Sequence, residues 1–169
     1  MNKITIGAAY HEAGHVVALL LTDRRFEYVT IVPTKGKVDK SIKLGHVKTK
    51  PYKFKKGDVT LSFFMPNEFQ SFFRYNFLNI AGHVTEKIRT GRYDNLWDSS
   101  DFRKLVYITL ENCPDNLRRS YEKFLFDYTK EVLTKEANWK RITAIAEALL
   151  EKKTLNYNEV NEVLRSIIW

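Results

Sequence analysis

The sequence predicts a mainly α-helical chain that forms a single domain over residues 1–169, with a small β-hairpin or sheet beside its first helix. Three observations indicate this class. Long segments carry apolar residues at helical spacing, and two short segments near the N-terminus are rich in β-branched and aromatic residues. Neither repeats nor shifts in composition mark a domain boundary. At 169 residues the chain is long enough to bury one core.

The first predicted helix covers residues 8–21 and is apolar almost all round, so we expect it at the centre of the fold. It nevertheless carries His11, Glu12 and His15, and buried polar side chains need partners. Because His11 and His15 are four residues apart, both project from one helix face, where two imidazoles can bind one zinc ion. The pattern H-E-x-x-H on a helix is the signature of zinc hydrolases, in which the glutamate moves a proton. The alternative is a core helix whose histidines form hydrogen bonds elsewhere.

Strands and helices follow this helix in a regular order. The expected strands cover residues 26–33, which end at a proline, and 43–49, with a turn at 34–37 between them and a loop at 50–58 after them. The expected helices cover 66–90, a segment starting near 98, a segment starting at 114–115, and the pair 139–152 and 157–168 around a turn at 153–156. Two strands need helices to lie against, and a free strand edge beside a metal site is a place where an extended peptide could add as a strand.

The net charge of +8 is local. Between Asp23 and Lys56 there are eleven Lys or Arg residues against three acidic ones, and the rest of the chain balances. This basic patch, Arg24–Lys56, is either the solvated surface of a hairpin and loop or a surface that attracts an anionic partner. We do not expect nucleic acid as the partner, because the patch contains no recognised binding motif. A single cysteine, Cys113, excludes an internal disulfide and a cysteine-based metal cluster, which leads us to expect a cytoplasmic protein. His11, Glu12 and His15 interrupt the only long apolar run, so we expect no membrane segment.

Two histidines do not complete a hydrolytic zinc site, which uses three protein ligands and leaves one position for water. The extended motif with a third histidine is excluded, because that position is Leu21. From the residues alone, the candidates for the third ligand are equivalent: Asp101, Asp98, Glu86 and His83.

Several segments, taken in order, resemble the proteolytic domain of the FtsH-type ATP-dependent zinc metalloproteases. The similar segments are Tyr10–His15 at the zinc helix, Val29–Pro33 and Leu44–Gly45 at two strands, Ala81–Ile88 at a Gly-Gly-x-x-Ala-Glu-x helix, Asp98–Leu105 at a Ser-Asn-Asp segment, and the terminal helix pair. The resemblance implies a helical, zincin-like peptidase domain. It also implies that His11, His15 and Asp101 bind Zn²⁺ and that Glu12 is the catalytic base. Glu86 would then orient a ligand histidine or form a surface salt bridge.

The chain also departs from this family. Ala81 replaces a glycine and His83 replaces a basic residue, and the sequence contains neither a P-loop nor a membrane helix. We therefore expect a metallopeptidase that cuts flexible or unfolded peptides, with a separate ATPase or protein partner supplying any unfolding. The alternative is a catalytically inactive protein that binds a metal or a partner. Gly14 is expected to let another backbone approach the zinc helix closely.

Overall fold

The computed structural model describes residues 3–35, 42–49, 66–91 and 100–167. Its helices are α1 (Lys3–Leu21), α2 (Pro66–Thr90), α3 (Ser100–Asn112), α4 (Asp115–Thr134), α5 (Glu136–Lys152) and α6 (Tyr157–Arg165). Its strands are β1 (Phe26–Thr30), β2 (Thr34–Lys35), β3 (Ile42–Lys43), β4 (His46–Thr49) and β5 (Thr154–Asn156). The prediction of a mainly helical chain with a small sheet is confirmed, and the sheet is antiparallel.

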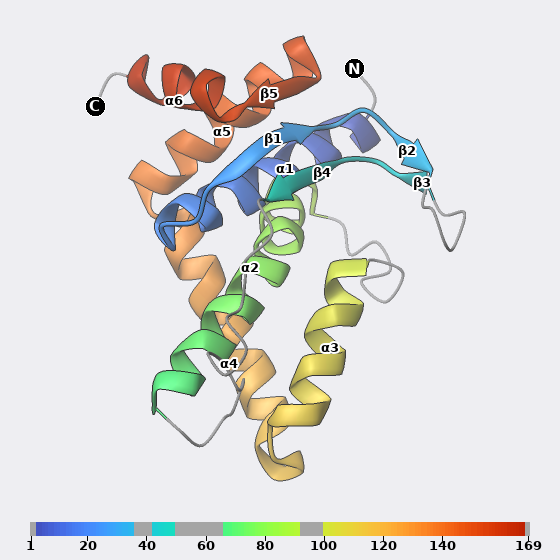
Figure 1. Cartoon of the computed structure of the whole chain (residues 1–169), viewed down its shortest axis with the longest axis vertical. Coiled ribbons are helices and arrows are strands. Elements are labelled where there is room, and N and C mark those ends of the chain that lie inside the picture. Colours follow the sequence, from blue (N-terminus) through green and yellow to red (C-terminus); the bar gives the residue numbers. More distant parts are fainter. Residues whose placement is uncertain (1–2, 36–41, 50–65, 92–99, 168–169) are drawn as a thin grey trace.

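Helix α1 lies at the centre of the fold, as predicted. It packs against α2 and α5 and also contacts β1 and β4 (Figure 1). Its buried residues occupy all sides of the helix: Gly7, Ala8, Ala9, Tyr10, Glu12, Ala13, Gly14, Val16, Val17, Ala18 and Leu19. Many of these residues are small, which lets the neighbouring elements approach closely. The helix begins at Lys3, five residues before the predicted start.

The length and composition of α1 would also allow it to cross a membrane, which holds for no other helix in the described residues. The expectation that this run is too interrupted for a span was therefore wrong on those two criteria. Most of α1 is buried inside the fold, as is usual for the core helix of a globular protein. Its length and composition alone thus carry little weight for a membrane location.

The described sheet beside α1 has the strand order β4-β1-β5, with both pairings antiparallel. Val29 in the central strand lies opposite Val47 on one side and Leu155 on the other. Two expectations were wrong here. Residues 154–156, predicted as a turn, form β5, because the buried Leu155 completes the core against β1. Thr34–Lys35, also predicted as a turn, pairs with β3 as a second small sheet.

Helix α2 has the predicted bounds. It packs against α1 at one end and against α4 and α3 further along (Figure 1). Most of its predicted apolar stripe is buried, including Phe72, Phe77 and Val84, and the remaining members are partly buried against the core. The helix ends before Gly91, whose φ of +69° is a left-handed conformation that glycine adopts readily. The predicted loop at 50–58 and the irregular stretch at 92–97 lie outside the described residues.

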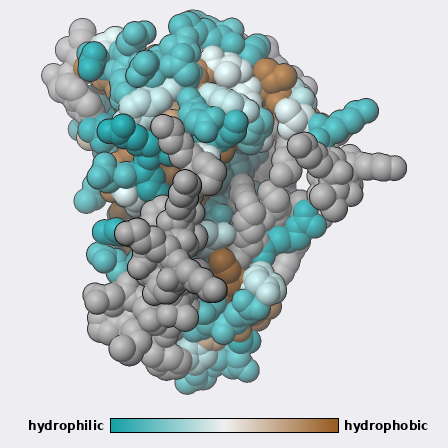
Figure 2. All heavy atoms as spheres, viewed as in Figure 1, coloured by the Kyte–Doolittle hydropathy of each residue, from teal (hydrophilic) through white to brown (hydrophobic). Residues whose placement is uncertain are grey.

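The C-terminal helices differ from the predicted ones only at their ends. Helix α5 begins at Glu136 rather than at 139, and α6 ends at Arg165 rather than at 168. The side chain of Asn156 accepts hydrogen bonds at the N-terminus of α6, and Glu159 completes a capping box there. On the face seen in Figure 2, hydrophilic residues predominate among the described ones, and hydrophobic residues form small separate patches.

Candidate metal centre

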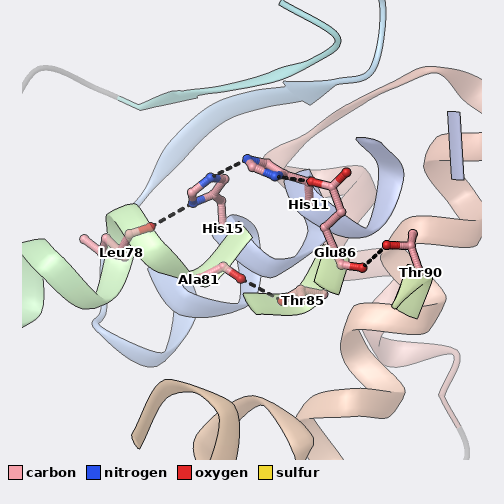
Figure 3. Close-up of polar contacts among 7 residues, drawn as sticks. All are labelled: His11, His15, Leu78, Ala81, Thr85, Glu86 and Thr90. Atoms are coloured by element: carbon pink, nitrogen blue, oxygen red, sulfur yellow. Dashed lines mark hydrogen bonds and ion pairs between the residues drawn. The ribbon is translucent and has the colours of Figure 1, made fainter. Parts of the chain in front are cut away.

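His11 and His15 lie on one face of α1, and their rings converge. The two Nε2 atoms are 3.1 Å apart, and the ring centroids are 4.8 Å apart (Figure 3). Both side chains are partly buried, and 14% of the His11 side chain is exposed. The structure therefore brings together the two histidines of the H-E-x-x-H pattern at a point that water can reach.

The other nitrogen of each ring is held by α2. His15 Nδ1 lies 2.8 Å from the carbonyl oxygen of Leu78, and His11 Nδ1 lies 2.9 Å from Oε2 of Glu86 (Figure 3). A carbonyl oxygen and a carboxylate oxygen accept hydrogen bonds, so both Nδ1 atoms carry the hydrogen in the neutral rings. Both Nε2 atoms then present lone pairs to each other. Of the two alternatives stated for Glu86, the structure has the contact with a histidine of this pattern.

Two facing lone pairs need a cation or a proton between them. Two nitrogens bound to one tetrahedral zinc ion at about 2.0–2.1 Å are about 3.3–3.4 Å apart. The separation of 3.1 Å between the Nε2 atoms is close to that value. In metal sites, a ligand histidine usually donates its second N–H to a carboxylate or a backbone carbonyl, which fixes its tautomer and orientation. Both histidines have this arrangement, so the pair fits a zinc ion.

Glycines explain how α2 comes close enough to hold both rings. A Cβ on Gly14 would lie 2.8 Å from the carbonyl oxygen of Ala81, closer than real Cβ atoms lie to other atoms. A Cβ on Gly82 would lie 2.7 Å from Nε2 of His11 and would also collide with Nε2 of His15. The close approach expected at Gly14 is therefore present, and Gly82 leaves room for the rings over the backbone of α2.

Glu12 is buried, with 5% of the residue exposed, and it lies toward the start of β4. A Cβ on Gly45 would be 2.9 Å from Oε1 of Glu12 and 2.7 Å from the carbonyl oxygen of Thr30. A glycine is thus required at residue 45, between the central strand and the glutamate. The arrangement places the carboxyl group of Glu12 beside the strand that forms one edge of the described three-stranded sheet.

The third ligand is not settled by the described side chains. Asp101 lies in the first turn of α3, and its side chain, like the whole of Asp98, lies outside the described residues. Among the side chains that are described, His11, His83 and Glu86 offer ligand atoms within 4.8 Å of one another. This group could hold a metal ion, and His15 is not a member of it.

His46 belongs to the sheet rather than to this group of histidines. Its Nε2 lies 3.2 Å from the hydroxyl of Tyr28, and the two rings pack edge to face. It is not a member of the group formed by His11, His83 and Glu86.

Sequence reasoning missed two parts of this centre. The carbonyl of Leu78 holds His15, and a backbone acceptor leaves no signal in the residue types. Gly82 borders both rings, and its place in the segment Ala81–Gly82–His83 was a detectable signal, because a glycine inside a helix implies a close neighbour.

Comparisons with known proteins add no further constraint. Neither a protein-family model nor a curated protein matches the chain.

Proposed function

We propose that this chain is a zinc-dependent metallopeptidase that hydrolyses flexible or unfolded peptides, built as a zincin-like domain of the FtsH type. The observation that carries the proposal is the pair of Nε2 atoms 3.1 Å apart, each on a ring whose Nδ1 atom is already bound. Both rings are therefore already held in the orientation and the tautomer that metal binding requires. Nitrogen ligands and a tetrahedral separation favour zinc among the common metals.

In this proposal His11 and His15 bind zinc through Nε2, and Asp101 supplies the third ligand. Bound zinc would supply a Lewis acid that polarises the peptide carbonyl and acidifies a water molecule. Glu86 keeps His11 in the tautomer that binds metal, and the carbonyl of Leu78 does the same for His15.

Glu12 acts as the general base and then as the general acid. It follows a ligand histidine directly in the chain, so its carboxylate can lie beside the metal without binding it. It would take a proton from the attacking water and pass it to the leaving amine nitrogen. Glu12 is also buried next to a proposed ligand histidine on the central helix, which supports a role at the metal centre.

The position of β4 supports a peptide as the substrate. In the described sheet, β4 pairs with β1 on one side only, and the residue before it, Gly45, borders Glu12. An extended peptide could add to this edge by main-chain hydrogen bonds and bring its carbonyl to the centre. A folded protein could not, so unfolding would require a separate ATPase or another partner.

The test measures cleavage of a mixture of unstructured peptides by wild type and by Glu12→Gln, with zinc bound to both. Loss of the general base should lower the rate by about 10²- to 10⁴-fold. Glu147→Gln, a change of the same kind on the exposed face of α5, is the matched control and should retain the wild-type rate.

Equal rates for wild type and Glu12→Gln would refute the catalytic role. Zinc binding by wild type with no hydrolysis of any peptide would instead favour the second candidate, an inactive metal-binding or partner-binding protein. The departures at Ala81 and His83 from the family's second motif favour that candidate.

A further inference from the structure

A second group of metal-binding side chains shares His11 but not His15. His83 and Glu86 are three residues apart on α2, so they lie on one face of that helix, toward His11. The rings of His11 and His83 meet edge to face, with centroids 4.6 Å apart and an interplanar angle of 89°. The ligand atoms of the three residues all lie within 4.8 Å of one another.

We propose that His11, His83 and Glu86 form a second transition-metal site, which uses Nδ1 of His11 where the first site uses Nε2. The two nitrogens of an imidazole point in different directions, so one ring can serve two sites. Two imidazoles and one carboxylate are suitable donors for zinc, cobalt or nickel ions. This site goes beyond the proposed peptidase activity, because it requires neither His15, Glu12 nor Asp101.

The geometry needs little adjustment. His11 Nδ1 and Glu86 Oε2 are 2.9 Å apart, and two such ligands of one zinc ion lie about 3.3 Å apart. The ion would take the place of the hydrogen that now lies between these two atoms, and this hydrogen would leave to the solvent as a proton. With both sites filled, His11 would bridge the two ions as an imidazolate anion. A modest movement of the His83 side chain would complete the set, since its ligand atom lies within 4.8 Å of the others.

The three side chains are also accessible to an incoming ion. All three residues are partly buried, and 14% of the His11 side chain and 29% of the Glu86 side chain are exposed. Because the ion must displace the hydrogen bond between Glu86 and His11, this site should bind metal more weakly than the pair of Nε2 atoms. Filling it would also alter the ring that holds the first ion.

The experiment is a zinc titration of the full chain against a chromophoric indicator. We expect two bound ions in wild type, one tight and one weaker. His83→Gln should lose the weaker ion and keep the tight one. His15→Ala should lose the tight ion and keep the weaker one, and the double variant should bind none.

Glu86→Gln is a second, milder test. The glutamine carbonyl can still accept the hydrogen bond from His11 Nδ1, but an amide is a much poorer metal ligand than a carboxylate. This variant should keep the tight ion and lose the weaker one. Circular dichroism of each variant checks that it is folded, and this matters most for His83→Gln because His83 is partly buried.

The outcomes separate the two sites. A second ion that binds equally well to wild type, His83→Gln and Glu86→Gln would overturn the proposal, as would a single ion that is lost only in His15→Ala. A single ion that is lost in His83→Gln and kept in His15→Ala would support the second site and count against the first. The proposed function and this inference can therefore fail independently.

Discussion

Replacing Gly82 with alanine should disrupt the histidine pair while leaving the fold intact. The added methyl group would lie 2.7 Å from Nε2 of His11 and would also collide with Nε2 of His15. Neither ring can move away freely, because the opposite nitrogens are bound to Glu86 at 2.9 Å and to the carbonyl of Leu78 at 2.8 Å. At least one of these two hydrogen bonds must lengthen or break.

The structure gives the size of the expected effect. A hydrogen bond of this kind contributes about 1–3 kcal/mol, the larger figure applying to the charged partner. Since about 1.4 kcal/mol is a tenfold change in a dissociation constant, Gly82→Ala should weaken zinc binding about 10- to 100-fold. Alanine is also favoured over glycine inside a helix by about 1 kcal/mol, which offsets part of the loss in the metal-free protein.

Two measurements check this prediction. A competition titration against a zinc indicator gives the dissociation constant, and urea unfolding in the presence of a chelator gives the stability of the metal-free form. Gln70→Ala, an exposed change on the same helix, is the control and should leave zinc affinity unchanged. Wild-type zinc affinity in Gly82→Ala would refute the argument that these two rings bind the ion from their present positions.

Four further predictions concern other contacts. Glu86→Ala should weaken binding of the first zinc ion by about 10- to 100-fold, measured by the same titration, because the orientation of a ligand histidine is lost. Tyr121→Phe should lower the free energy of unfolding in urea by about 1–2 kcal/mol, because the buried amide of Asn76 loses the hydroxyl to which it donates at 3.0 Å. Asn156→Ala should lower the free energy of unfolding in urea by about 1 kcal/mol, because the N-terminus of α6 loses its cap. Hydrogen bonds from Asn156 and Lys152 lower the pKa of Glu159. The interactions of this carboxylate should therefore stabilise the fold above the ordinary glutamate pKa, and the stabilisation should be lost as the pH falls through the lowered pKa. A free energy of unfolding that does not decrease over this acidic range would contradict the prediction.

The pattern of residue types predicted most of the helices. The bounds of α2 were predicted without error, because its apolar positions keep helical spacing and Gly91 ends it. The burial of α1 was predicted from a segment that is apolar on every side. Both signals are local, since they depend on residues that are near in sequence.

The pattern failed where an element depends on a distant partner. The three residues of β5 are too few to carry a strand signal, and they become a strand because β1 offers hydrogen bonds and a buried position for Leu155. The same applies to β2, which is a strand only through its pairing with β3.

The candidate site likewise depends partly on local spacing and partly on distant residues. The four-residue spacing of His11 and His15 places both rings on one helix face whatever the rest of the chain does, so the sequence alone determined that two imidazoles can meet one ion. Only the tertiary structure decided which nitrogens face each other. That choice depends on Leu78 and Glu86, which are 63 and 75 residues distant from the histidines they hold. It also depends on Gly14 and the close approach of α2, because hydrogen-bond partners are selected by the packing of whole helices.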